Sequence, residues 1–350
     1  MNLNDNFLMK RCLNLASKGI GRTSPNPMVG AVVVLNNKII GEGYHKGYGK
    51  DHAEVCAIKS VKNQKLLKGS TLYVNLEPCN HFGKTPPCTD LIIRKKISKV
   101  VIGTSDPNPK VSGKGIKKLI ENKIDVKVNI LKDECSELNK RFFCYQRNKR
   151  PYIILKWAES KDRFIAPSNK KNGKIYWISS PKSRKIVHKW RSEEDSIAVG
   201  INTIISDNPQ LDNRYFGGKS AIPIIIDPDN RLKNNFKVFQ KHKKIFHFID
   251  TKINDFNKSS IKINFEKSIE SMINYIYKKN INSILVEGGA KTINSFIDLN
   301  LWDEARVFRS KKNLITGIKA PVFSYSNEII KKNISEDELS YYLNSSENKL

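Results

Sequence analysis

The sequence has 350 residues, 39% of them hydrophobic, with a mean hydropathy of −0.48, and a chain of this length and composition favours two globular domains over one. No segment reaches the roughly 18 apolar residues that cross a bilayer, and residues 1–5 lack a basic segment with an apolar stretch behind it, so we expect neither a membrane partner nor export. Six cysteines are too few for a disulfide framework in a chain this long, which indicates a reducing, cytoplasmic location.

The net charge is +28, from 62 Lys and Arg against 34 Asp and Glu. Such an excess is typical of proteins that bind nucleic-acid phosphates, but here the lysines are spread over the whole chain among many Asn and Ile residues. This distribution indicates a biased base composition expressed at tolerant surface positions, so we expect no nucleic-acid partner. The charge would also attract a phosphorylated substrate and an anionic cofactor.

The first elements are a helix and a hairpin. Apolar residues between Phe7 and Ala16 recur at helical spacing, and Gly19 or Gly21 offers the end of that helix. The segments 30–35 and 38–43 are then expected to pair as an antiparallel hairpin.

Four residues in the next part of the chain have the types and spacing of a catalytic zinc site. His52, Cys79 and Cys88 supply one nitrogen and two thiolates, and catalytic zinc keeps three protein ligands and leaves its fourth position to water. Glu54 lies two residues after the histidine, too close in sequence for a fourth ligand but well placed to move protons between water and a leaving amine. The pattern predicts hydrolytic deamination.

A closed structural zinc site is the alternative, with His81 as a fourth ligand, and a second alternative is two unrelated thiols near a core histidine. A glutamate two residues after the histidine has no purpose in a closed site, so we favour the catalytic interpretation.

The elements expected around these residues place the ligands at helix and strand ends. A helix is expected from His52 to about Val61, a buried strand at 71–75 with Cys79 just beyond it, and a helix at 89–96 preceded by Cys88. The dipole of that last helix favours a thiolate at its N-terminus.

The rest of the first domain completes a sheet covered by helices. Strands are expected at 100–103 and 125–129, with a helix at 114–121 between them. The cysteines outside the metal site lie in stretches with helical spacing and are interpreted as small buried apolar residues. They are Cys12, Cys56, Cys135 and Cys144.

A basic polar stretch at 146–151 marks the boundary between two domains. Beyond it strands and helices alternate, so most of the second sheet should be parallel, with a ligand crevice outside the carboxyl ends of its strands. Strands are expected at 152–157, 196–199, 221–226, 244–249, 283–287 and 304–307, and helices at 181–192, 203–206, 269–279 and 291–299.

One strand end in this domain has the features of a phosphate site. Gly288 and Gly289 follow an expected strand and lead into a helix, so backbone N–H groups and the helix N-terminus can approach a phosphate. A tight turn explains the two glycines equally well. No Gly-x-Gly-x-x-Gly follows any expected strand, which argues against a Rossmann nucleotide site.

The motifs around the zinc residues resemble a known family. The segments 76–88, 23–30 and 105–109 resemble the deaminase domain of the bifunctional riboflavin-biosynthesis deaminase/reductase, in which a long loop separates the two cysteines; here eight residues do so. The resemblance implies a cytidine-deaminase-like α/β/α sandwich and a diaminopyrimidinone substrate that bears a ribose 5-phosphate and loses its amino group at ring position two. Asn26, His81 and Lys84 match positions of substrate contacts, although turn and loop-capping roles also suit them.

The second half of the chain resembles the reductase domain of the same family. The matching segments are 156–162, 177–180, 200–211 and 285–290. The resemblance implies a dihydrofolate-reductase-like α/β domain that uses NADPH to convert the ribosyl side chain to ribityl. We therefore expect a deaminase domain at 1–147 and a reductase domain at 150–350, with zinc and NADPH as cofactors.

The resemblance also assigns residues of the reductase site, position by position. Lys156 and Asp207 are candidates to assist hydride transfer, although a surface lysine and a helix-capping aspartate are the plain alternatives. The residues expected to hold the cofactor are Ala158, Trp177, Thr203, Asp207, Gly289, Ala290, Lys291, Thr292, Ile293, Asn294 and Ser295. The residues expected to meet the substrate are Arg191, Leu211, Arg214 and Glu287, and an arginine suits a ribose phosphate because its planar fork forms paired charge-assisted bonds.

The chain departs from the family pattern at three places. Arg163 stands where the family usually has glycine, and Pro228 stands where a small polar residue often meets the cofactor, so that one backbone donor is lost. The polar tail after Val322 has no role that the sequence suggests.

Three hypotheses remain open at this point. The favoured one is a two-step enzyme of riboflavin synthesis acting on a phosphorylated pyrimidine, expected to be a homo-oligomer. The second is a nucleic-acid base deaminase, for which the sequence shows no base-stacking aromatic platform. The third keeps the deaminase but makes the second domain a catalytically silent module.

Overall fold

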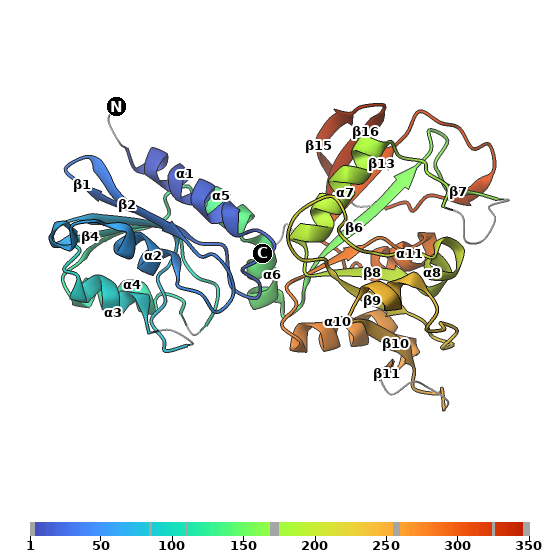
Figure 1. The fold of residues 1–350 in the computed structure, drawn as a ribbon, viewed down its shortest axis with the longest axis horizontal. Helices are drawn as coiled ribbons and strands as arrows, with labels where there is room; N and C mark the ends of the chain where they lie inside the picture. Colours follow the sequence, from blue (N-terminus) through green and yellow to red (C-terminus); the bar gives the residue numbers. More distant parts are fainter. Residues whose placement is uncertain are drawn as a thin grey trace. The chain divides into compact units, whose positions relative to one another are not determined.

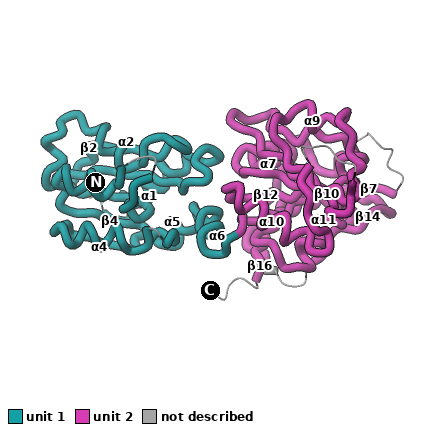
Figure 2. The backbone as a smooth tube through the Cα atoms, turned by 90° about the horizontal axis from the view of Figure 1, so that it is seen from below, with its two compact units in different colours: residues 1–149 teal, residues 150–350 magenta. Residues whose placement is uncertain are grey.

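The computed structural model describes residues 4–83, 86–109, 111–168, 175–254, 260–323 and 326–345. The chain divides into two compact units, Met1–Lys149 and Arg150–Leu350 (Figure 2). Each unit is built on its own main sheet. Within these described ranges, no helix combines the length and the apolar character that a membrane span requires.

The first unit contains a five-stranded mixed sheet in the order β2-β1-β3-β4-β5 (Figure 1). β1 runs antiparallel to both β2 and β3, whereas β3, β4 and β5 are parallel. The carboxyl ends of β3 and β4 therefore lie at the same edge of the sheet. The strands are β1 (Gly30–Leu35), β2 (Lys38–Tyr44), β3 (Thr71–Leu76), β4 (Lys99–Thr104) and β5 (Asp125–Lys127).

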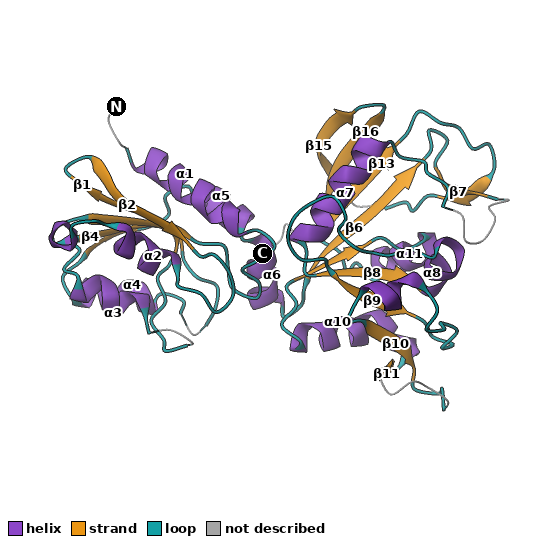
Figure 3. Ribbon diagram, viewed as in Figure 1, coloured by secondary structure: helices purple, strands orange, loops and turns teal. Residues whose placement is uncertain are grey.

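Helices cover both faces of this sheet (Figure 3). Ala31 and Val33 of β1 pack with α2, α3 and α4 on one face, and Val32 and Val34 pack with α1 and α5 on the other. Because successive side chains of a strand point to opposite faces, this all-apolar strand serves two cores. The helices are α1 (Asp5–Ala16), α2 (Ala53–Ser60), α3 (Cys88–Arg94), α4 (Lys114–Glu121), α5 (Lys132–Leu138) and α6 (Lys140–Asn148).

The second unit contains a nine-stranded sheet in the order β11-β10-β9-β8-β12-β6-β13-β16-β15. The strands from β11 to β13 are parallel, and β13, β16 and β15 are antiparallel. The prediction of a mostly parallel sheet is confirmed. The strands are β6 (Tyr152–Glu159), β8 (Ser196–Gly200), β9 (Ile222–Ile226), β10 (Phe246–Asp250), β11 (Ser260–Ile263), β12 (Ser283–Val286), β13 (Glu304–Arg309), β15 (Ser326–Ile334) and β16 (Asp337–Asn344), and β7 (Phe164–Pro167) pairs separately with β14 (Gly317–Lys319).

Two apolar clusters hold the helices of this unit against its sheet. The larger one joins Ile153 and Leu155 of β6 to α10 and α11, and the smaller joins Ile197 and Val199 of β8 to α8 and α9 on the opposite face. The helices are α7 (Pro181–Glu193), α8 (Ile201–Asp207), α9 (Lys237–Lys241), α10 (Ser268–Lys278) and α11 (Ala290–Asp298).

The tail after Val322 differs most from the sequence expectation. It forms a long hairpin, β15 and β16, which pairs with β13 and extends the main sheet. Asp337, Ser340 and Asn344 of β16 are buried polar residues, so the alternation of apolar and polar residues that predicts a strand is missing here. One cysteine also departs from expectation: Cys56 lies in a helix but is partly exposed, whereas Cys12, Cys135 and Cys144 are buried.

The structure gives a reason for the glycine that the family usually has at position 163. Arg163 has a φ of 66° in the turn between β6 and β7, a left-handed conformation that glycine adopts without steric cost. Here the Arg163 Nε atom lies 3.3 Å from a carboxylate oxygen of Glu159, an interaction that partly offsets the strain.

The first residue of the second unit is anchored within that unit. The Arg150 guanidinium donates two hydrogen bonds of 2.7 Å to the carboxylate of Asp303, and the Ile153 N–H donates to the same carboxylate at 2.6 Å. Arg150 and Asp303 are both buried. This ion pair joins the start of β6 to the start of β13 and so fixes where the second sheet begins.

Candidate functional site

The three expected metal ligands meet at the ends of three elements of the first unit. His52 is the N-cap of α2, Cys79 follows β3, and Cys88 opens α3. The His52 Nδ1 atom lies 3.5 Å from the Cys79 sulfur and 3.4 Å from the Cys88 sulfur. Tetrahedral zinc with ordinary bond lengths separates its nitrogen and sulfur ligands by about 3.5 Å, so the donor set and its spacing fit zinc.

Glu54 lies beside these ligands in the first turn of α2. Its side chain is buried, with 4% of its surface exposed. Burial raises the pKa of its carboxyl group, and a negatively charged Cys79 raises it further. A raised pKa makes the protonated form of a carboxyl group more accessible, which suits a proton shuttle.

Two neighbouring hydrogen-bond donors favour the thiolate form of Cys79. The Cys88 thiol and the His52 imidazole both hydrogen-bond to the Cys79 sulfur and lower its pKa, and the Cys88 N–H lies 3.4 Å from the same sulfur. Because zinc binds thiolates, this arrangement prepares Cys79 for the metal.

His81 does not join the metal group. Among the described residues, His52, Cys79 and Cys88 form the one group of His, Cys, Asp and Glu side chains with metal-ligand spacing. His81 is partly exposed, and its buried Nδ1 atom has no hydrogen-bond partner among the described residues. The geometry therefore favours a site with three protein ligands.

Of the other two residues expected to contact the substrate here, the structure describes only Asn26. The Asn26 amide nitrogen lies 3.2 Å from Nε2 of His45, and the His45 ring meets the His52 ring edge-on with centroids 5.5 Å apart. His45 thus contacts both Asn26 and the expected metal ligand His52. Lys84 lies outside the described residues.

Sequence reasoning missed Glu77, which holds the loop beside the metal ligands. Its buried carboxylate accepts hydrogen bonds from four backbone N–H groups, at distances of 3.0 to 3.3 Å. The donors are Asp106, Gly113, Gly115 and Ile116. A glutamate directly after an apolar strand and two residues before a cysteine was the signal that could have revealed it.

In the second unit, three expected residues from distant parts of the chain form one ionic cluster. Arg191 of α7 donates from Nε and Nη2 to the Glu287 carboxylate, at 2.9 and 2.8 Å, and the Lys156 ammonium of β6 lies 3.5 Å from it. Burial raises the pKa of Glu287, but Arg191 and Lys156 outweigh burial and bring the pKa to about 2. Burial lowers the pKa of Lys156.

Leu211 and Arg214 lie on a loop that is bonded to the same helix. The Arg214 N–H donates to Nδ1 of His188 in α7 at 3.3 Å, and Nη1 of Arg191 donates to the Asp212 carbonyl at 3.3 Å. Leu211 is buried and has a φ of 54°. Arg191 thus contacts Glu287 directly, and hydrogen bonds to Arg191 and His188 hold the loop that carries Leu211 and Arg214 against α7.

The expected cofactor residues concentrate where α8 and α11 begin. The Gly289 N–H donates to the Thr203 hydroxyl at 3.0 Å. A Cβ atom on Gly200 would lie 2.4 Å from the Thr292 hydroxyl oxygen, and one on Gly288 would lie 2.9 Å from the Thr292 Cβ. Both glycines therefore permit α11 to approach β8, and the N-terminus of α11 faces the carboxyl end of the sheet, where a phosphate binds favourably.

The remaining cofactor candidates divide between exposed and buried positions. Lys291 and Asn294 are exposed on α11, whereas Ile293 is fully buried in the core. Ala158 lies in β6, and Asp207 is the last residue of α8. The segment 290–295 is helical throughout, so a cofactor meets its backbone only at the first turn.

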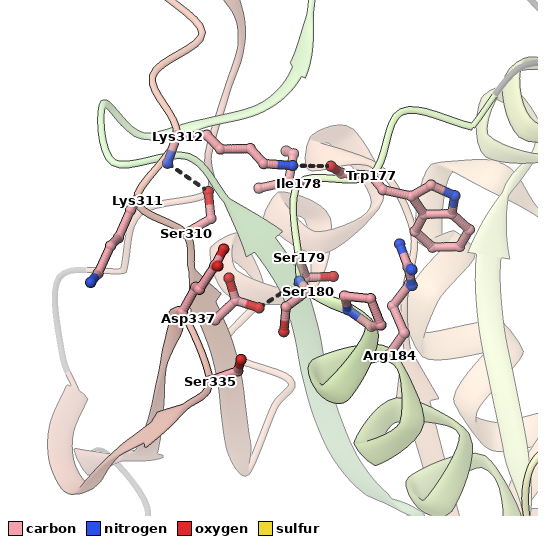
Figure 4. Close-up of a pocket in the computed structure, with 12 residues that line it drawn as sticks. Trp177, Ile178, Ser179, Ser180, Arg184, Ser310, Lys311, Lys312, Ser335 and Asp337 are labelled. Carbon is pink, nitrogen blue, oxygen red and sulfur yellow. Dashed lines mark hydrogen bonds between the residues drawn. The ribbon is translucent and has the colours of Figure 1, made fainter.

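Trp177 lies apart, at a pocket of about 350 Å³ shown in Figure 4. The Arg184 guanidinium lies over its ring, 4.3 Å from the centroid, and the Lys312 ammonium donates to its carbonyl at 3.0 Å. The pocket is lined by the start of α7, the segment after β13 and the turn between β15 and β16.

Comparisons with known proteins cover both units. Residues 3–104 match the cytidine and deoxycytidylate deaminase zinc-binding region, and residues 151–314 match the RibD C-terminal domain. The riboflavin biosynthesis protein RibD of Aquifex aeolicus is 40% identical, with 90% of this chain and 89% of that protein aligned, and the RibD of Escherichia coli is 33% identical over 89% of each.

Solved structures agree over the whole chain. The diaminohydroxyphosphoribosylaminopyrimidine deaminase/5-amino-6-(5-phosphoribosylamino)uracil reductase of Thermotoga maritima is 36% identical, with a TM-score of 0.89 over 97% of this chain and 98% of its own. RibD of Acinetobacter baumannii is 28% identical, with a TM-score of 0.88 over the same shares. The chain therefore belongs to the RibD family of bifunctional riboflavin-biosynthesis enzymes, in which a zinc-dependent deaminase of cytidine-deaminase-like fold is joined to an NADPH-dependent reductase of dihydrofolate-reductase-like fold.

Proposed function

We propose that the first unit deaminates 2,5-diamino-6-(5-phosphoribosylamino)pyrimidin-4(3H)-one and that the second unit reduces the ribosyl side chain of the product to give 5-amino-6-(5-phosphoribitylamino)uracil. The observation that carries the proposal is the meeting of His52, Cys79 and Cys88 at zinc spacing beside the buried carboxyl group of Glu54. The Lys156, Arg191 and Glu287 cluster supports the second step.

In the first step Glu54 is the catalytic acid and base. His52, Cys79 and Cys88 would hold zinc, which would activate a water molecule as the nucleophile at neutral pH. Glu54 would accept one proton from the attacking water and give it to the ring nitrogen, and would then carry the proton of the added hydroxyl group to the amino group, which leaves as ammonia. Asn26, His81 and Lys84 are proposed to orient the pyrimidine and its phosphate.

In the second step the chain's own residues bind and orient two anionic molecules. NADPH, when bound, supplies a hydride to the opened ribose. We assign the NADPH site to the carboxyl ends of β8 and β12, where the Gly289 N–H donates a hydrogen bond to the Thr203 hydroxyl. Lys156 is the proposed proton donor, because burial lowers its pKa, and Asp207 is proposed to assist. Pro228 offers no N–H to the cofactor.

Substrate binding in this unit is assigned to Arg191, Leu211, Arg214 and Glu287. The paired donors of Arg191 are engaged by Glu287, whereas the Arg214 side chain is 45% exposed. We therefore assign the binding of the ribose phosphate chiefly to Arg214. Arg191, whose paired donors are bonded to the Glu287 carboxylate, contributes only its positive charge.

The test gives zinc-loaded protein the diaminopyrimidinone ribosyl phosphate together with NADPH, and follows both ammonia release and the loss of reduced-nicotinamide absorbance. Ammonia with equal NADPH loss supports both steps. In Glu54→Gln both signals should disappear, and added deaminated intermediate should restore NADPH loss alone. Ammonia release without NADPH loss would mean that the second unit is catalytically silent. The absence of both signals would overturn the proposal.

We also propose that the enzyme works in the cytoplasm as a homo-oligomer. None of the six cysteines forms a disulfide, which suits a reducing compartment. Light scattering after gel filtration tests the assembly, and a monomer at working concentration would refute it.

A further inference from the structure

The C-terminal hairpin contacts the helix that carries Arg191. β16 lies between β13 and β15 in the sheet, and the turn between β15 and β16 reaches the start of α7 (Figure 4). Asp337, the first residue of β16, is 3% exposed, although a lone carboxylate is rarely buried without partners. The partners of the Asp337 carboxylate lie at the N-terminus of α7.

The Asp337 carboxylate occupies the N-terminus of α7. One of its oxygens accepts from the Ser180 N–H at 2.7 Å and from the Ser183 hydroxyl at 2.6 Å. Ser180 is the N-cap, and its hydroxyl accepts from the Ser183 N–H at 3.3 Å. A carboxylate at this end of a helix satisfies otherwise unpaired donors and complements the helix dipole. The helix end in this pocket is therefore already filled by the chain itself.

The same hairpin touches α7 a second time, close to its other end. The Trp190 ring lies against Phe308 of β13 and Tyr341 of β16, with centroids 5.5 and 6.3 Å apart. The Arg306 guanidinium lies 4.6 Å from the Trp190 ring centroid. Two contacts separated along the helix fix both its position along its axis and its rotation.

The two ends of α7 lead directly to site residues. Arg191 follows Trp190 and grips Glu287, and Trp177 lies three residues before Ser180. We infer that Asp337 is a positioning residue of the reductase: through the N-terminus of α7 it sets where Arg191 and Trp177 meet substrate and cofactor. The inference rests on the proposed function of the second unit and gives the C-terminal tail a role in it.

The experiment compares Asp337→Asn with Glu336→Gln in the full-length protein. Glu336 is an exposed neighbour that lines the same pocket, so its variant controls for the loss of one charge. Three quantities are measured for each: KM and kcat for the deaminated intermediate, the Kd of NADP+ from quenching of tryptophan fluorescence, and the rate of ammonia release as an internal control for the other unit.

Asp337→Asn should raise KM and Kd by about 10-fold each, the cost of weakening one charge-assisted contact network, and should leave kcat within about 2-fold and ammonia release unchanged. Glu336→Gln should match the wild type in every quantity. A kcat that falls with KM and Kd unchanged, or an Asp337→Asn enzyme that matches Glu336→Gln, would overturn the inference.

Ser183→Ala provides a second, milder variant. It removes one hydroxyl contact of Asp337 while the carboxylate and the N-cap remain, so KM and Kd should rise less, and the double variant should add little to Asp337→Asn. If Asp337→Asn does not fold, an unchanged KM and Kd in Ser183→Ala overturns the inference. A wild-type protein that binds NADP+ but does not oxidise NADPH would instead refute the proposed function.

Discussion

The two candidate active sites of this chain are built in opposite ways. The metal centre takes its ligands from a short stretch, His52 to Cys88, and each lies at the end of a neighbouring element. The second site joins Lys156, Arg191 and Glu287, and the Arg191–Glu287 contact spans 96 positions of sequence. The difference teaches that local spacing reveals metal chemistry, whereas an ionic cluster assembled across a sheet leaves no local pattern.

The largest effect should come from the metal site and should be confined to one activity. Cys88→Ser replaces a thiolate with a weak zinc ligand. The affinity for zinc and the rate of ammonia release should each fall by at least about 1000-fold, and the zinc content of the purified protein should fall with them. Reduction of added deaminated intermediate should stay at the wild-type rate. Metal analysis and the two assays check this outcome, and a simultaneous loss of reduction would show that the sites are coupled.

The ionic cluster should show its importance first in stability. Glu287→Gln leaves Arg191 and Lys156 buried without a counter-charge, and the unfolding free energy of the second unit should fall by about 3–5 kcal/mol. Urea unfolding followed by fluorescence measures this, since all four tryptophans lie in that unit. Glu266→Gln, an exposed change in the same unit, should leave the midpoint unchanged. A Glu287→Gln midpoint equal to that of the control would contradict the ionic account.

Glu77 offers the corresponding test in the first unit. Glu77→Gln replaces two acceptor oxygens that serve four N–H groups with one oxygen and an amide that cannot accept, so the unfolding free energy of that unit should fall by about 2 kcal/mol. Circular dichroism during urea unfolding checks the value, with the exposed Glu121→Gln as its control. We expect the larger loss of unfolding free energy in Glu287→Gln, because that change removes the counter-charge of two buried cations. A larger loss in Glu77→Gln would contradict this order.

The smallest effect is a pH dependence confined to the second unit. Burial and the positive charges of Arg191 and Arg214 together lower the pKa of His188 to about 4, against the opposing effect of Glu287 and Asp212. The unfolded chain takes up this proton below about pH 6.5. His188 therefore contributes full stability above that pH, and the contribution decreases as the pH falls towards 4.

His188→Asn isolates that term, because the asparagine oxygen can still accept from the Arg214 N–H. The difference in unfolding free energy between the wild type and this variant should shrink as the pH falls from 7 to about 4. A difference that stays constant with pH would mean that His188 is not buried in its neutral form.

Sequence reasoning found the metal centre and most of the strands because each depends on neighbours in the chain. Cys79 and Cys88 were identified from residue type and spacing alone, and α3 begins at Cys88, next to the predicted helix start. Arg191 and Glu287 came only from the family resemblance, since their pairing is a property of the folded sheet. His45 was missed because a lone histidine gives no signal until Asn26 and His52 are seen beside it.

The C-terminal hairpin could not be predicted for a different reason. Its strand β16 buries Asp337, Ser340 and Asn344, so a polar sequence occupies an interior strand of the sheet, next to the edge strand β15. Two of these side chains have partners far along the chain: Asp337 meets α7, and Asn344 donates to the Trp302 carbonyl at 2.9 Å. Composition suggests a solvated tail wherever polar residues are satisfied by such distant partners.

The buried Arg150–Asp303 pair bears on how this chain could have arisen. Both partners belong to the second unit, so a polypeptide that starts at Arg150 retains its own anchor, and one that ends at Lys149 gives up no partner of that pair. Two genes that each encode one half would therefore keep the pair intact. Fusion of the halves into one reading frame then supplies equal amounts of both catalysts, a benefit at the level of the cell that requires no new contact between them.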